Sequence, residues 1–293
     1  SKDYATISKL VDIDQFARFE ALRMTHADLH SAKGDNLKLL YNNSTGKFSP
    51  FFRSESVIGD LEAYVSENIY LYDSIAFDIP IMEILTQNNN FRNLRNKYLY
   101  EIIQDRAELK EYYASVLEKF VNAVSEDTSN LLSQRDYIYQ AESKFKLFEK
   151  NLNAIEKYLA YGRMYSLLTS YNPRDYVLEI DADSNVFTKL NKIQIFGSEY
   201  DDVIVNVKNL KNNKVMKVSE IEEYFKNERF ILGLNKNLQT EDNTKIYHLS
   251  LDQDVDVNNF EISFLNEVTG KEILDINNYV KYVKQAQNFS FDF

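Results

Sequence analysis

The chain has 293 residues, of which 44% are hydrophobic, so it is long and apolar enough to bury the core of one large or two ordinary domains. Its net charge of −11 disfavours nucleic acid and anionic membrane surfaces as partners, and no apolar run approaches the length of a membrane span. Cysteine is absent, which excludes disulfides, thiolate metal sites and thiol nucleophiles.

The first predicted element is a helix within residues 11–31, where apolar residues recur close to one helical face. Asp12 or Asp14 is its expected N-terminal cap, because a short acidic side chain can accept hydrogen bonds from the first turn. The chain starts with Ser1 and shows no basic-plus-apolar leader, so we expect that residues upstream of it belong to the same protein.

A hairpin is predicted directly after this helix. Residues 36–42 and 47–52 contain the β-formers of two strands, and the turn between them ends in Gly46, where a hairpin needs positive φ. The polar stretch from residue 26 to residue 48 therefore lies at a helix-to-hairpin junction.

A helical block is predicted next, because neither proline nor glycine occurs between Pro80 and Gly162 and apolar residues recur at helical spacing. Asp78 and Pro80 are typical of a helix start. The tyrosine and phenylalanine stripes of the block are expected to be core rather than a ligand site. The predicted helices are residues 79–87, 88–105, 106–127 and 129–171, the last as one long or two consecutive helices.

The pattern changes at "SYNPRD", residues 170–175, after which short β-forming runs alternate with Asn, Asp and Gly turns. One short helix, residues 219–227, is predicted among these strands. The sequence thus indicates an α+β chain of two domains: a helical region with a hairpin over residues 1–172 and a β-sandwich-like domain over residues 173–293.

Four residues at the helix-to-hairpin junction have types that suit phosphoryl transfer: Asp28, His30, Asp35 and Asn36. One carboxylate can orient an acceptor hydroxyl, while an asparagine and a second carboxylate hold a divalent cation on the nucleotide phosphates. The alternative is an ordinary polar loop at a helix end, because solvated Asp, His and Asn are common in turns.

Other polar groups indicate weaker candidates. His26 and His30 are spaced i, i+4, as in a helical zinc site, but no glutamate follows His26. Asp252, Asp254 and Asp256 are spaced like calcium ligands, but the glycine and distal glutamate of an EF-hand loop are missing. His248 is expected in a strand without a chemical role.

The order of motifs from Asp12 to Glu126 resembles the carboxy-terminal half of the CotH family, spore-coat-type protein kinases with an atypical kinase fold. The resemblance lies in a helix that leads to an Asp-x-His loop, an asparagine before "LY", a hairpin with "GKF-x-P" and a later helix with "RN-x-Y". It implies that Asp28 is the catalytic-loop aspartate with His30 beside it, and that Asn36, with Asp35, lies on the magnesium side.

The resemblance also implies ATP and magnesium as cofactors, a protein or surface polysaccharide as the acceptor, and an extracytoplasmic, bacterial location. Two departures from the family pattern point to a pseudokinase. The metal-binding aspartate expected after the hairpin is replaced by the segment around Arg53, with Glu55 as the nearest carboxylate. The lobe that carries the nucleotide-binding lysine should lie upstream, so this chain alone is expected to be inactive.

Two alternatives remain open on the sequence. One is a non-catalytic cell-envelope or surface protein, whose helices support a β-sandwich that binds protein or glycan. The other is a carbohydrate-active enzyme with paired carboxylates in the helical block, although no particular pair stands out.

Overall fold

A computed structural model describes residues 2–28, 30–31, 36–51, 58–62, 79–126, 133–172, 175–197, 205–209, 215–217, 224–225, 245–251, 257–274 and 277–282. These residues form a mixed α and β chain with a small antiparallel hairpin, as predicted. The described residues divide into two compact units, one up to Ala160 and the other from Tyr161 onward, whereas the sequence placed the change after residue 172.

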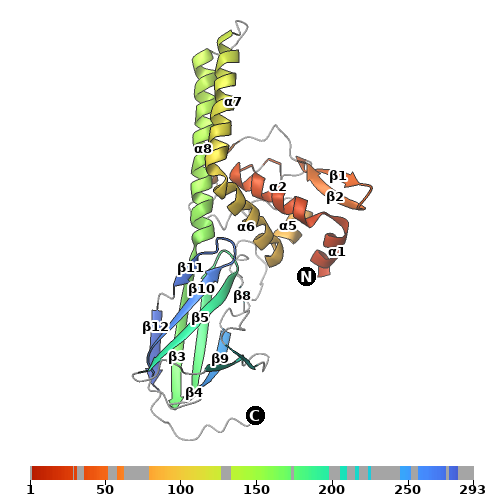
Figure 1. Cartoon of the computed structure of the whole chain (residues 1–293). Helices are drawn as coiled ribbons and strands as arrows, with labels where there is room; N and C mark the ends of the chain where they lie inside the picture. Colours follow the sequence, from red (N-terminus) through yellow and green to blue (C-terminus); the bar gives the residue numbers. More distant parts are fainter. Residues whose placement is uncertain are drawn as a thin grey trace. The chain divides into compact units, whose positions relative to one another are not determined.

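Two helices begin the first unit, α1 (Lys2–Leu10) and α2 (Ile13–Thr25) (Figure 1). The predicted cap of α2 is confirmed, because the Asp12 side chain accepts a hydrogen bond from the Gln15 N–H at 3.2 Å. Sequence reasoning missed α1. Its Tyr4 and Ile7 pack against the same apolar cluster as Phe16 of α2, so α1 owes its place to this contact.

The predicted hairpin is present as β1 (Lys38–Asn42) and β2 (Lys47–Phe51), which pair antiparallel without a bulge. Gly46 has φ +67°, the left-handed conformation that its position requires. The turn is closed by Asn42, whose side-chain oxygen accepts the Ser44 N–H at 2.9 Å. Tyr41 and Phe48 face each other across the two strands with ring centroids 5.0 Å apart.

Two further helices, α5 (Pro80–Thr86) and α6 (Asn89–Gln104), complete the core of this unit. Pro80 occupies the first turn of α5, as predicted, and Asn88 caps α6 by accepting the N–H groups of Asn90 and Phe91. The core cluster joins α2, α5 and α6 and consists of Val11, Phe16, Ala17, Ile79, Met82, Leu85 and Phe91.

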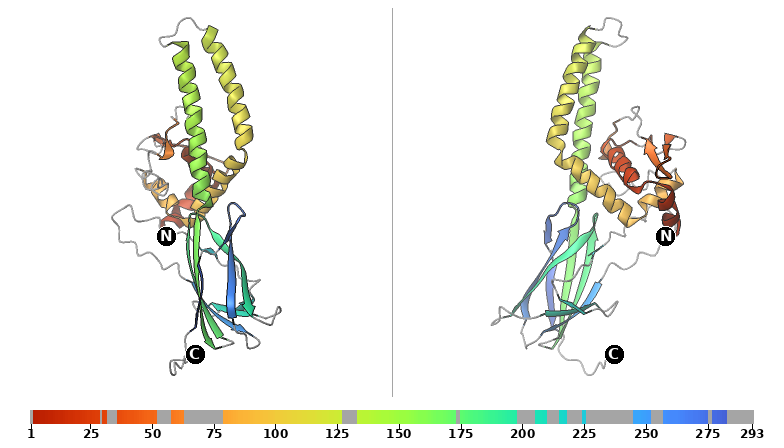
Figure 2. Two further views of the ribbon diagram at one scale, coloured as in Figure 1. Left: turned by 90° about the vertical axis from the view of Figure 1, so that its left-hand side faces the viewer. Right: turned by 45° about the vertical axis from the view of Figure 1, so that its right-hand side comes forward.

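Helices α7 (Arg106–Glu126) and α8 (Gln134–Ala160) lie side by side as an antiparallel pair (Figure 2). The predicted helix over 129–171 is therefore too long, because α8 ends at Ala160 and a strand begins at Gly162. None of the helices within the described ranges is both long and apolar enough to cross a membrane.

The second unit consists of strands in its described parts. Most strands predicted after residue 174 are confirmed. The strands are β3 (Gly162–Asn172), β4 (Asp175–Ser184), β5 (Thr188–Gly197), β6 (Val205–Asn209), β7 (Val215–Lys217), β8 (Tyr224–Phe225), β9 (Lys245–Leu251), β10 (Val257–Asn266), β11 (Glu272–Leu274) and β12 (Asn277–Tyr282).

These strands form one sheet in the order β12-β3-β4-β9-β6-β7 and another in the order β11-β10-β5-β8. All pairs are antiparallel except β12 with β3. Tyr224 and Phe225 pair with β5 as strand, although the sequence predicted a helix over 219–227. One of the β-forming runs on which the prediction of this domain depends, residues 229–234, lies outside the described residues.

Candidate functional site

The loop that follows α2 begins with a helix-terminating motif. The Asp28 N–H donates to the Arg23 carbonyl at 2.9 Å, and the Ala27 N–H donates to the Met24 carbonyl at 3.0 Å. This is the Schellman pattern, which places the residue after the C-cap in the left-handed region. Ala27 has φ +48°, although a non-glycine residue there costs about 1–2 kcal/mol. The surrounding contacts therefore hold the loop in a strained turn.

Asp28 is buried, with 1% of its surface exposed, and its carboxylate binds its own loop. One oxygen accepts the N–H groups of His30 at 2.9 Å and Ser31 at 3.1 Å. The other oxygen accepts the Ser31 hydroxyl in a short hydrogen bond. The side chain thus caps the turn over residues 28–31, in the way that Asp side chains commonly organise turns.

A buried ion pair supports the same turn from within α2. Arg23 donates from Nε and Nη2 to the two carboxylate oxygens of Glu20, at 2.8 and 2.6 Å, and both side chains are fully buried. Its remaining Nη1 donates to the backbone carbonyl of Asp28 at 3.0 Å. A guanidinium bonded on both edges in this way fixes where the loop leaves the helix.

Helix α8 attaches residues 58–62 to this loop. Asn151 is fully buried and donates from Nδ2 to the carbonyls of Thr25 and Gly59, each at 3.0 Å, while its Oδ1 accepts the Leu61 N–H at 2.9 Å. The neighbouring Lys150 binds Asp60 at 2.8 Å, and this hydrogen bond raises the pKa of Lys150 above its usual range. The predicted loop therefore belongs to a polar structural core.

Among the other predicted site residues, His30 belongs to the Asp28 turn, Asn36 lies after it, and the rest lie outside the described part. His30 is exposed, and Asn36 is half-buried immediately before Leu37, which packs on the apolar cluster of α2, α5 and α6. Asp35, Arg53 and Glu55 lie outside the described residues, as does the acidic run 252–256. The roles of Asp28, His30, Asp35 and Asn36 in catalysis and metal binding stay predictions.

The two histidines of the zinc alternative do not share a helical face, because α2 ends at Thr25. His26 instead places Nδ1 2.8 Å from the Leu22 carbonyl and its ring 5.5 Å from that of Phe148 on α8.

The donors around Asp28 bear on the predicted binding of magnesium and ATP. The carboxylate of Asp28, the predicted catalytic residue, is directed to Ser31 and His30, and of the predicted metal-side residues Asn36 and Asp35 the structure describes Asn36. Over the described ranges, no three or more His, Asp and Glu side chains gather as a cation site.

The sequence gives little sign of the polar core around Asp28. A Glu-x-x-Arg spacing on the buried face of α2 is a faint signal, because charged residues are rarely buried unless paired. Asn151 carries no signal, since its partners lie about 90 and 126 positions away in the chain. The chain matches neither the models of known protein families nor the curated proteins with which it was compared.

Proposed function

We propose that this chain is the carboxy-terminal part of a CotH-like protein that works as a pseudokinase, binding a protein or surface polymer without phosphorylating it. The order of elements supports the kinship: a capped helix, a loop with Asp28, an asparagine at position 36 and then the hairpin β1–β2. The observation that carries the non-catalytic role is the Asp28 carboxylate, which is buried and hydrogen-bonded to residues 30 and 31.

The chemical argument is one of access. A catalytic-loop aspartate has to come within hydrogen-bond reach of an acceptor hydroxyl. Only 1% of the Asp28 surface is exposed to such a group, and opening the turn would break three hydrogen bonds.

The second unit is proposed to be a β-sandwich-like accessory domain, the finer form of the predicted fold. Support comes from contacts between strands of the two sheets, β10 with β12 and β11 with β3, and from the buried side chains of Tyr176 and Phe264. Two sheets packed face to face bury side chains of this kind between them.

Two substitutions at Asp28 test the proposal, because they distinguish a carboxylate that caps the turn from one that acts as a catalytic base. Asparagine keeps an acceptor for the two N–H groups, whereas alanine removes it, so Asp28→Ala is expected to lower the free energy of unfolding by about 1–3 kcal/mol and Asp28→Asn by less than half of that. Thermal and urea unfolding measure both values.

Phosphotransfer is measured on the same proteins with γ-labelled ATP and magnesium, using the chain itself and casein as acceptors. The pseudokinase proposal expects no label transfer above background from the parent chain. Transfer by the parent that Asp28→Asn abolishes, while the fold and stability persist, would instead identify Asp28 as a catalytic base and overturn the proposal.

A further inference from the structure

The hairpin β1–β2 exposes an unusual amount of apolar surface. All five residues of β1 are exposed, with Leu40 at 58% and Tyr41 at 54% of their maximum. Phe48 and Phe51 of β2 are exposed as well. Exposed apolar groups gathered on one small element are typical of an interaction surface.

The backbone of the hairpin shows which groups face outward. The Asp12 N–H donates to the Phe48 carbonyl at 2.8 Å, so this carbonyl points away from β1. Phe48 pairs with Tyr41, and in an antiparallel ladder two opposite residues either both bond inward or both face outward. The N–H and C=O groups of Tyr41 therefore point to the outer edge of β1. Because bonded and non-bonded pairs alternate along the ladder, the N–H and C=O groups of Leu39, which pairs with Pro50, also point to the outer edge.

The two edges of the hairpin differ. The outer edge of β2 is closed, because Phe48 already accepts from Asp12 and Pro50 has no N–H to donate. The outer edge of β1 carries the donors and acceptors of Leu39 and Tyr41, and within the described part of the chain β2 is its only paired strand. Strand β1 has neither a proline nor a bulge, which are features that commonly prevent the addition of a strand.

Side-chain alternation gives the two faces of this edge different chemistry. Leu39 and Tyr41 share a face with their partners Pro50 and Phe48, so that face is apolar. Lys38 and Lys47 lie on the other face together with Leu40 and Phe51, so that face combines basic and apolar groups. Residues 36–51 contain these two lysines and no acidic residue, in a chain whose net charge is −11.

We propose that the outer edge of β1 binds an extended peptide of another protein, in which apolar and acidic residues alternate. The added strand forms up to four hydrogen bonds with Leu39 and Tyr41. Its apolar side chains extend the face of Tyr41 and Phe48, and a carboxylate on the opposite face meets Lys38. A second copy is the poorer occupant, because it would join two cationic hairpins on two chains of net charge −11.

The inference names a partner class for the proposed binding role and so rests on it. The test uses the full chain and a blocked, fluorescently labelled peptide in which valine and glutamate alternate, with binding followed by anisotropy. Leu39→Pro removes one outward donor and leaves the bonds to β2 in place, so we expect about tenfold weaker binding. Leu39→Ala keeps the donor and is expected to bind within about threefold of the parent.

Charge is tested separately. A peptide in which valine and lysine alternate is expected to bind at least about tenfold more weakly to the parent, and Lys38→Glu is expected to reverse that preference. Far-UV circular dichroism and thermal unfolding of Leu39→Pro check that the fold is kept. Peptide binding does not depend on ATP, so its failure is distinguishable from a positive phosphotransfer result at Asp28.

Three results would overturn the inference. The first is no saturable binding of the valine–glutamate peptide up to about 1 mM, the weak end of measurable affinity. The second is equal binding by the parent and Leu39→Pro. The third is a dimer of the parent in sedimentation velocity that Leu39→Pro dissociates, which would identify the edge as a contact between copies of this chain.

Discussion

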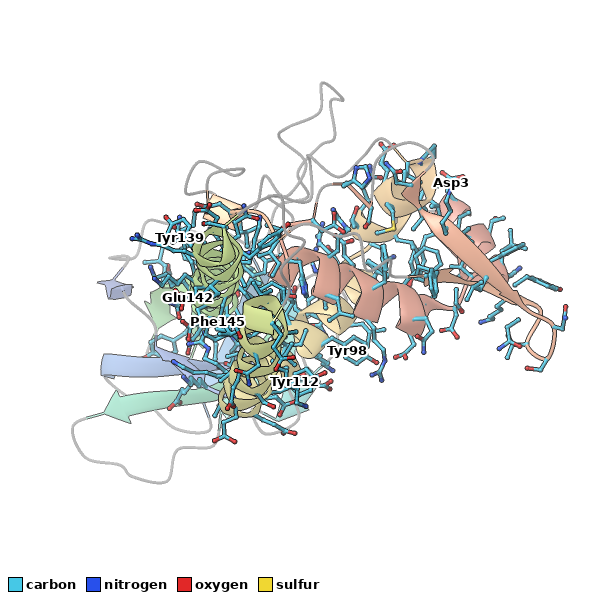
Figure 3. All side chains as sticks on the ribbon, turned by 90° about the horizontal axis from the view of Figure 1, so that it is seen from above. Asp3, Tyr98, Tyr112, Tyr139, Glu142 and Phe145 are labelled. Atoms are coloured by element: carbon cyan, nitrogen blue, oxygen red, sulfur yellow. The ribbon has the colours of Figure 1, made fainter. Side chains whose placement is uncertain are left out.

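Asp14, Arg18 and Tyr98 form a small charged cluster where α2 meets α6. Asp14 accepts a short hydrogen bond from the Tyr98 hydroxyl and a second from Arg18 Nε at 2.9 Å. The Arg18 guanidinium also lies 4.2 Å from the centroid of the Tyr98 ring. Figure 3 shows Tyr98 on the side of its helix that faces α2. The cluster thus joins two helices through one carboxylate.

This cluster predicts a pH dependence of stability. The hydrogen bond from Tyr98, followed by Arg18, holds the pKa of Asp14 below its usual range. A carboxyl whose folded-state pKa is lowered stabilises the fold above its unfolded pKa, about 3.9, and this contribution is lost as pH falls through the folded value. Asp14→Asn is therefore expected to unfold at a lower temperature than the parent at pH 6, with the difference shrinking towards pH 2.

Because Asp14 and Arg18 are both about half exposed, solvent screening keeps the expected shift in melting temperature small, a few degrees at most. Tyr98→Phe is the matched control, since it removes the strongest bond to Asp14 and should reduce the effect of Asp14→Asn measured in its background. A melting-temperature difference that stays constant from pH 6 to pH 2 would contradict the assignment.

At the same scale, Asp28 shows the limit of residue types as evidence. Asp, His and Asn at a helix end were compatible with catalysis and with a capped turn, and the sequence could not decide between them. The decision depends on where the carboxylate points, which is set by the Schellman turn at Ala27 and by the Arg23–Glu20 pair. Both side chains of that pair are fully buried, and this burial is a property of the fold that the residue types do not reveal.

At the scale of elements, two adjacent tyrosines of α7 lie on different sides of the helix. One faces α8 and the other faces solvent. Tyr113 stacks on Phe145 with ring centroids 4.3 Å apart and donates its hydroxyl to the Ala141 carbonyl at 2.9 Å. Burial raises the pKa of Tyr113. Tyr112 is 70% exposed and points away from α8, as Figure 3 shows.

Tyr113→Ala is therefore expected to lower the free energy of unfolding by about 1–3 kcal/mol, because it removes ring packing and a hydrogen bond. Tyr112→Ala loses little contact and should change it by less than about 0.5 kcal/mol. Urea unfolding followed by circular dichroism at 222 nm gives both values. Equal losses in the two variants would mean that the helices do not pair through Tyr113.

Local signals predicted most of the elements of the first unit. Four residues take the position that their type favours. Asp12 and Asn88 cap helices, Pro80 lies in a first helical turn, and Gly46 has positive φ. The helix predicted to run to Tyr171 failed for a non-local reason. Residues 162–172 form β3 between β4 and β12, and β12 lies more than a hundred positions away in the chain. Helical spacing within the segment could not reveal those partners.

At the scale of the whole molecule, the same strand decides where the chain can be divided. β3 pairs along its length with β4 and over residues 165–170 with β12, both in the second unit, whereas α8 packs on α7 and α6 of the first. A first-unit fragment should therefore end at Ala160. Extending it to Asn172 adds a strand of eleven residues without either of its pairing partners.

We expect a fragment of residues 1–160 to be monomeric, helical and cooperative in thermal unfolding. A fragment of residues 1–172 should have the same helical signal but associate or precipitate, because β3 then presents two unpaired edges to other copies. Sedimentation velocity and circular dichroism compare the two directly. If the longer fragment is monomeric and gains helical signal, residues 162–172 are helical outside the second unit, and the division at residue 172 read from the sequence is the better one.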